Sequence, residues 1–94
     1  MPAYSVAIFT VSDPERYQEY AKLAGPAVDK FGGKFFMRGS KPEVMEGSFD
    51  HARMVIVEFP DMDTARKYAS SPEYHAARSK RLGAADFNLI LFEG

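Results

Sequence analysis

The sequence predicts an α+β domain in which helices cover one face of an antiparallel sheet of four strands. Three observations support this prediction. The 94 residues have the length of one domain, residues 1–94. Four apolar segments rich in β-branched and aromatic residues have the character of strands, and the segments between them repeat apolar residues at helical spacing. The resulting order is β-α-β-β-α-α-β.

The first predicted strand is Ala3–Val11, whose apolar side chains occur on both alternating faces, as a central strand requires. After it, Asp13 suits the cap of a helix and Pro14 its first turn, where the missing N–H removes no hydrogen bond. Apolar residues then recur at helical spacing until Gly32-Gly33 ends the helix. We expect Gly25-Pro26 to kink this helix or to break it into two pieces.

Residues 34–39 form the second predicted strand and Arg53–Phe59 the third, which is the strongest strand in the sequence. The connection between them, residues 40–52, is too long for a tight hairpin, and residues 44–46 could add a minor strand. Connections of this length often carry function, so this segment is of interest for a binding site.

A helix begins after the third strand, with Asp61 or Asp63 at its start. The helical pattern restarts at Ser71-Pro72, where Ser71 suits the cap and the proline the first helical position. An alternative start is a capping box made by Ser70 and Glu73. We therefore expect two short helices in succession.

The last helix runs to about residue 82, and residues 87–93 form the fourth strand. Because crossover connections are right-handed, the helices of both β-α-β units lie on the same face of the sheet. The result is the ferredoxin-like arrangement, with the first and third strands in the centre and one face of the sheet uncovered.

Side-chain alternation assigns the strand residues to the two faces. On the uncovered face, the expected register opposes three pairs: Lys34 and Glu58, Phe36 and Ile56, and Arg38 and Met54. On the helix side it places Phe35, Met37, Val55, Val57, Phe87, Leu89 and Leu91. The uncovered face is still too apolar to lie in water, so we predict a homodimer in which the sheets of two copies face each other.

The composition narrows the class of protein. Hydrophobic residues make up 46% of the chain and charged residues 27%, as in globular domains rather than disordered ones. A net charge of −1 without a basic stripe argues against a nucleic-acid partner. The absence of cysteine excludes disulfides, thiol nucleophiles and thiolate metal sites. No signal peptide or membrane-spanning run is visible, so we expect a cytoplasmic protein without a membrane partner.

Glu58 is the first candidate for catalysis, because a carboxylate among apolar neighbours can gain the proton affinity of a general base. The alternative, which we favour, is an ion pair with Lys34 or a neighbouring arginine on the dimer side of the sheet. His75, early in the last helix, is the second candidate for moving a proton. Neither His75 nor His51 has a partner at ligand spacing, so we predict no metal site.

Three residues of the last helix could hold the carboxylate or enolate of a substrate. Tyr74, Arg78 and Arg81 fall at positions i, i+4 and i+7, which places them on one face. The alternative that we favour is a solvated basic face near the end of the helix.

Arg38 and Arg53 flank the long connection and could reach the same or a neighbouring cleft, or else pair with nearby glutamates. Tyr17 and Tyr20 point from the first helix toward the sheet, where they could line a pocket with Phe36. Their helical spacing favours packing in the core over a role in binding.

Several short motifs occur together along the chain. They are Asp13-Pro14 with Tyr17 and Tyr20, Gly32-Gly33, Arg38-Gly39, Glu46-Gly47, Val57-Glu58-Phe59-Pro60, Ser71-Pro72-Glu73-Tyr74 and Glu93-Gly94. In their order and spacing the chain resembles, over essentially its whole length, the uncharacterised bacterial family known as domain of unknown function 1330. One departure is Ser40, which stands where the family often has a second glycine after the arginine.

The resemblance implies the dimeric α/β-barrel group, which is similar to cofactor-free monooxygenases of antibiotic biosynthesis and to muconolactone isomerases. It suggests an enzyme without a cofactor that moves a proton on a small aromatic or carboxylated metabolite. Two other hypotheses stay open: a non-catalytic dimer that binds a metabolite, and a module whose charges only fix strand register and dimer geometry. Analogy of fold does not choose among the three.

Overall fold

The computed structural model describes residues 1–38, 42–49 and 53–94. Ser40 and His51, which the sequence singled out, lie outside these residues. The elements follow the predicted order and are β1 (Ala3–Val11), α1 (Pro14–Lys30), β2 (Lys34–Arg38), β3 (Arg53–Phe59), α2 (Met62–Ala69), α3 (Pro72–Arg81) and β4 (Ala85–Glu93). The predicted minor strand at residues 44–46 does not form, and β4 begins two residues earlier than expected.

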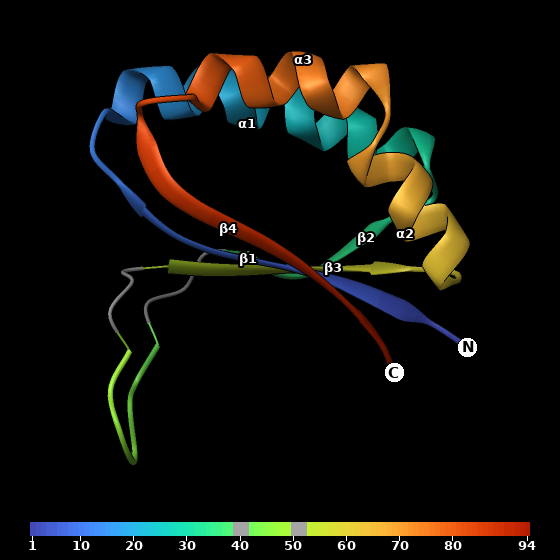
Figure 1. Cartoon of the computed structure of the whole chain (residues 1–94), viewed down its shortest axis with the longest axis horizontal. Helices are drawn as coiled ribbons and strands as arrows, with labels where there is room; N and C mark the ends of the chain where they lie inside the picture. The colour runs from blue at the N-terminus through green and yellow to red at the C-terminus, as the bar shows by residue number, and fades with distance from the viewer. Residues whose placement is uncertain (39–41, 50–52) are drawn as a thin grey trace.

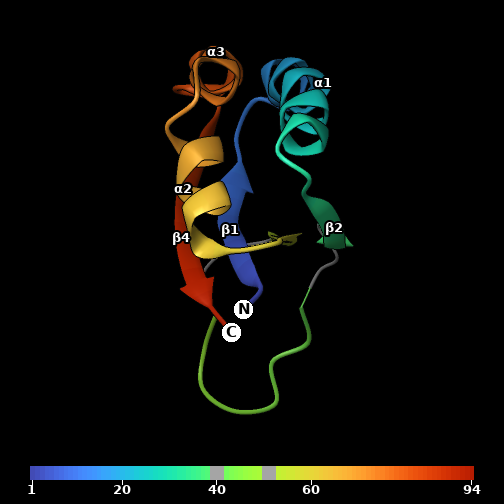
Figure 2. The same cartoon turned by 90° about the vertical axis from the view of Figure 1, so that its right-hand side faces the viewer.

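The four strands make one antiparallel sheet in the order β2-β3-β1-β4. The strands β1 and β3 are therefore central, and the ferredoxin-like arrangement is confirmed. Figure 1 shows all three helices on one side of the sheet, and Figure 2 shows α1 and α3 next to each other above it. No helix among the described residues is long and apolar enough to cross a membrane.

Side chains at the predicted caps start the three helices. The Asp13 carboxylate accepts a hydrogen bond from the Arg16 backbone N–H at 3.3 Å. At the second helix Asp61, rather than Asp63, accepts from the Thr64 N–H at 2.7 Å. At the third, Ser71 caps the helix and Pro72 occupies the first turn. Because each cap satisfies an N–H that the helix leaves unpaired, each fixes where its helix begins.

The helix α1 continues through Gly25-Pro26 as a single element of 17 residues, so the predicted break into two pieces is wrong. Two features explain the difference. A residue before proline normally resists the helical conformation because its Cβ meets the proline ring, and Gly25 has no Cβ. Beyond the proline, Ala27 and Val28 are buried in the core, and this tertiary packing compensates for the N–H that Pro26 lacks.

The register between β2 and β3 begins as predicted and then changes at a bulge. Between Phe35 and Met37 it shifts by one residue, so that Arg38 lies opposite Val55 instead of Met54. A shift of one residue moves a side chain to the other face of the sheet. The predicted position of Arg38 on the uncovered face is therefore wrong, and so is that of Met37 on the helix side.

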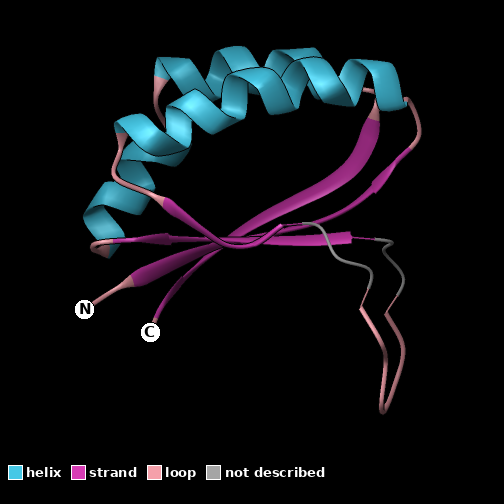
Figure 3. Cartoon of the chain, turned by 180° about the vertical axis from the view of Figure 1, so that it is seen from behind, coloured by secondary structure: helices cyan, strands magenta, loops and turns pink. Residues whose placement is uncertain are grey.

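The uncovered face exposes large apolar side chains beside the charged Lys34 and Glu58, as predicted. Phe36 is 71% exposed there, and its ring meets the edge of Tyr4 at 6.3 Å between centroids. Ile90 and Phe92 from β4 are also exposed. Residues 42–49 extend away from the sheet on this same side, opposite the helices (Figure 3).

Candidate functional site

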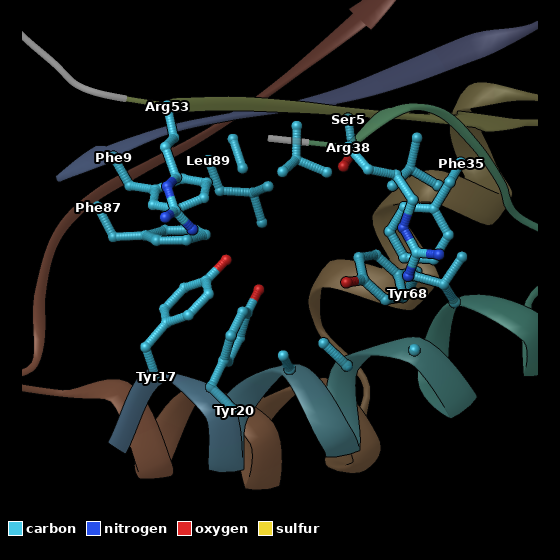
Figure 4. A pocket seen from close by; sticks show the side chains of 17 residues that line it. Ser5, Phe9, Tyr17, Tyr20, Phe35, Arg38, Arg53, Tyr68, Phe87 and Leu89 are labelled. Carbon is cyan, nitrogen blue, oxygen red and sulfur yellow. The ribbon is translucent and has the colours of Figure 1, made fainter. Parts of the chain in front are cut away.

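A cavity of about 220 Å³ lies between α1 and the sheet (Figure 4). Its floor is the helix side of β1, β3 and β4, and its roof is the segment of α1 from Tyr17 to Val28. Small residues leave the space open, since Ala21, Ala24 and Gly25 face it from the helix and Ala7 from the sheet. The cavity therefore forms where two layers meet across short side chains.

Aromatic rings make a large part of the cavity wall. Six of them line it: Phe9, Phe35, Phe87, Tyr17, Tyr20 and Tyr68. The ring of Phe9 stacks on Phe87 at 5.1 Å and on Tyr17 at 5.2 Å between centroids. Such a wall offers flat apolar surfaces, which suit a planar ligand.

Three phenols bring hydroxyl groups to the cavity. Figure 4 shows the hydroxyls of Tyr17 and Tyr20 pointing from α1 toward the sheet, and that of Tyr68 entering from the other end. Burial raises the pKa of all three, because the charged phenolate would lose its water. At neutral pH they are uncharged and can donate hydrogen bonds to an anion.

Two arginines lie at opposite ends of the cavity (Figure 4). Arg53 is near Tyr17, and its charge lowers the pKa of that phenol against the larger effect of burial. Arg38, which the bulge turns to this side, lies over the Phe35 ring with its Cζ 4.1 Å from the centroid. No residue that lines the cavity is acidic, so the described wall carries only positive charge.

Behind the wall, Tyr74 and Arg81 form a second layer. The Arg81 Nη2 donates to the Tyr74 hydroxyl at 3.1 Å, and both residues are buried. Arg78, which the sequence placed on the same face, is exposed. The inward stripe of α3 consists of Tyr74, Ala77 and Arg81, and Arg78 lies at its edge. Of the three residues predicted to act together, Tyr74 and Arg81 therefore lie in the interior, and Arg78 lies at the surface.

Neither candidate for proton transfer lines the cavity. Glu58 lies opposite Lys34, as predicted, but no ion pair joins them. Both residues border a separate shallow hollow together with Pro60. His75 is exposed on α3 beside Tyr74. Among the residues that the structure describes, no three histidine, aspartate or glutamate side chains gather as metal ligands.

The sequence identified Tyr17 and Tyr20 but missed the other four aromatic residues of the site. Phe9, Phe35, Tyr68 and Phe87 were not named as candidates, although strand alternation had placed Phe35 and Phe87 on the helix side. Phe36, which could have lined a pocket with the tyrosines, lies on the uncovered face, where the predicted register had placed it. Alternation thus identifies the residues that face the helices, but it does not tell a filled core from an open one.

A family model described as "Domain of unknown function (DUF1330)" matches residues 2–94. No functionally curated protein matches the chain. Among solved structures, a protein of unknown function from Rhodopseudomonas palustris is 22% identical with a TM-score of 0.78, and the match covers 99% of this chain and 82% of that one.

Two other structures share the fold. A dimeric ferredoxin-like protein of unknown function from Jannaschia sp. CCS1 is 13% identical with a TM-score of 0.77, and both chains are covered completely. SnoaB, a cofactor-independent oxygenase from Streptomyces nogalater, is 16% identical with a TM-score of 0.67, over 99% of this chain and 92% of that one. At these identities the likeness establishes the fold alone.

Proposed function

Because the chain belongs to the DUF1330 family, which is defined as a domain of unknown function, we propose a function from the cavity itself: the protein binds a small planar carboxylate between α1 and the sheet. The observation that carries this proposal is the combination of six aromatic rings, two arginines and no acidic residue in one lining.

The size of the cavity limits the ligand. Pockets for drug-sized molecules measure about 300–1,000 Å³, whereas this one measures about 220 Å³. A single aromatic ring with one or two substituents suits the volume. Stacking on the flanking rings would orient such a ligand along the sheet.

The charges favour an anion. Arg38 and Arg53 have no carboxylate partner in the described parts of the chain, so a ligand carboxylate would not compete with an existing ion pair. The neutral phenols of Tyr17 and Tyr20 would add hydrogen bonds to the same group. A neutral ligand would gain the stacking but not these interactions.

We also propose that the working form is a homodimer joined through the uncovered faces of two sheets. The support is the exposed apolar surface that includes Phe36, Ile90 and Phe92. Structural neighbours, including the protein from Jannaschia, are described as dimeric. In this assembly the cavities remain on the outer, helix-covered sides.

The second candidate function is catalysis without a cofactor. Phenols and guanidinium groups that converge on one space are donors suited to an enolate or a phenolate. SnoaB, which shares the fold, is a cofactor-independent oxygenase. The described lining holds no carboxylate or imidazole, so the substrate would have to be acidic enough to enter as the anion.

Titration calorimetry with benzoate tests the proposed binding. Arg53→Met should weaken benzoate binding by about tenfold, because an exposed charge-assisted hydrogen bond contributes at the lower end of about 1.5–3 kcal/mol. Arg78→Met is the matched control, since Arg78 is exposed on α3 outside the cavity and its loss should leave the affinity unchanged. Equal effects of the two variants, or no binding to the wild-type protein, would refute the proposal.

A second measurement separates binding from catalysis. Candidate ligands, incubated with the protein in air, are recovered and analysed by mass spectrometry. Recovery of unchanged ligand supports the binding module. Turnover that Arg53→Met lowers and Arg78→Met does not would support the enzyme.

A further inference from the structure

Arg81 is a buried cation without an acidic partner among the described residues. The residue is only 6% exposed, and its Nε has no hydrogen-bond partner. The ion pairs in the described chain do not include it. A guanidinium remains protonated in proteins, so Arg81 places a permanent positive charge in the interior. A buried charge without a counterion lowers the stability of the fold, so Arg81 must be explained by something other than stability.

The guanidinium of Arg81 lies directly behind one end of the cavity. Its Cζ is 3.7 Å from the centroid of the Phe87 ring and 5.2 Å from that of Tyr20. Both rings line the cavity, whereas Arg81 itself does not. One aromatic ring thus separates this charge from the space where a ligand would lie.

The positive charges of Arg53 and Arg81 both act on the end of the cavity that contains Tyr17. Burial raises the pKa of Tyr17, and the charges of Arg53 and Arg81 both lower it in part. Figure 4 shows Arg53 reaching from β3 toward the Tyr17 hydroxyl. Arg81 lies on the Phe87 ring from α3. Since apolar rings screen a charge far less than water does, the buried arginine still acts across the wall.

We propose that Arg81 is a positioning residue that makes the cavity selective for anions and holds the anionic group of the ligand at the end formed by Tyr17 and Tyr20. This inference rests on the proposed function and adds a residue that never touches the ligand. Arg53, an exposed residue of the lining, makes the direct contact, and Arg81 provides a buried charge that solvent does not screen.

The test compares benzoate with benzamide, its uncharged analogue, by titration calorimetry. The wild-type protein should prefer benzoate. Arg81→Met, which keeps the length of the side chain but removes the charge, should lower the ratio of the two affinities by about tenfold and leave benzamide binding unchanged. Arg81→Lys, which keeps the charge, should retain most of the preference.

Tyr74→Phe is the matched control, because it removes the same 3.1 Å hydrogen bond and keeps the charge of Arg81. The ratio of benzoate to benzamide affinity in Tyr74→Phe should equal that of the wild type. A purely structural Arg81 would make Arg81→Met weaken both probes equally, and that result would overturn the proposed role. Binding of benzoate and benzamide with equal affinity by the wild type would do the same. Binding of neither probe would refute the proposed function together with this role.

A second variant keeps the test decisive if Arg81→Met does not fold. Replacing both arginines of the lining, Arg38→Met with Arg53→Met, leaves Arg81 in place as a cation whose charge lowers the pKa of Tyr17. A preference for benzoate should persist in this variant and change less between 20 and ~200 mM salt than the wild-type preference, because Arg81 is buried. Loss of the whole preference would overturn the inference.

Discussion

A methyl group added at Gly33 tests how tightly the end of α1 packs on the sheet. The Cβ of an alanine would lie 2.7 Å from Val28 Cγ1 and 2.8 Å from Phe59 Cε1, closer than such atoms approach in proteins. Both neighbours are about 1% exposed and surrounded by the core, so neither can move away cheaply. The backbone at Gly33 does not have a positive φ, and the effect of the substitution is therefore one of space alone.

Overpacking of this kind costs about 1–3 kcal/mol. For a domain of this size that lowers the melting temperature by about 5–15 °C in Gly33→Ala, measured by thermal and urea unfolding followed by circular dichroism. Val28→Ala removes one of the two opposing atoms, so the double variant should be destabilised by at least about 0.5 kcal/mol less than the sum of the single ones. A loss under about 0.5 kcal/mol in Gly33→Ala, or strict additivity, would refute the close packing.

Three further predictions concern the caps and the phenols. Ser71→Ala should cost about 1–2 kcal/mol in urea unfolding, because its buried hydroxyl serves two hydrogen bonds, and a loss under about 0.3 kcal/mol would contradict this. Hydrogen bonds from Thr64 lower the pKa of Asp61, so its stabilisation is present above pH 3.8 and is lost as the pH falls through the depressed value. The melting temperatures of wild type and Asp61→Asn should therefore converge in acid. Burial raises the pKa of Tyr17, Tyr20 and Tyr68, so in an absorbance titration the phenols of the folded protein should ionise later than those of the urea-unfolded chain, and stability should fall as the pH rises above 10.

Most of the fold follows from local patterns in the sequence. The caps at Asp13 and Ser71 start their helices as predicted, and alternation places Phe87 and Leu89 on the helix side of β4. These signals are local, because a cap or an alternating strand needs only a few neighbouring residues to be recognised.

The bulge in β2 shows where this reasoning fails. One extra residue at Phe36 moves Arg38 from the predicted dimer face into the lining of the cavity. No residue in Lys34–Arg38 signals the bulge, since it contains neither glycine nor proline. The position of an arginine thus depends on pairing with a strand more than ten residues away.

The site itself depends on distances between elements. Tyr17 and Tyr20 have the spacing of core residues, and the cavity beside them is open because small residues, among them Ala21 and Ala24, line it. The burial of Arg81 likewise depends on a contact between α3 and β4, because its guanidinium lies on the Phe87 ring of β4. Neither feature follows from residue type or helical period. Tyr17 and Tyr20 pack with the core, as the sequence favoured, and they also line the cavity, whereas the solvated position favoured for Arg81 is wrong.

The most direct test of the account is the position of a bound ligand. Crystals grown or soaked with 4-bromobenzoate carry a bromine whose anomalous signal locates the ring. We expect one site per chain, between α1 and the sheet, with the carboxylate at the end where Tyr17, Tyr20 and Arg53 meet. Bromine on the uncovered face of the sheet, or a carboxylate turned away from Arg53, would contradict it.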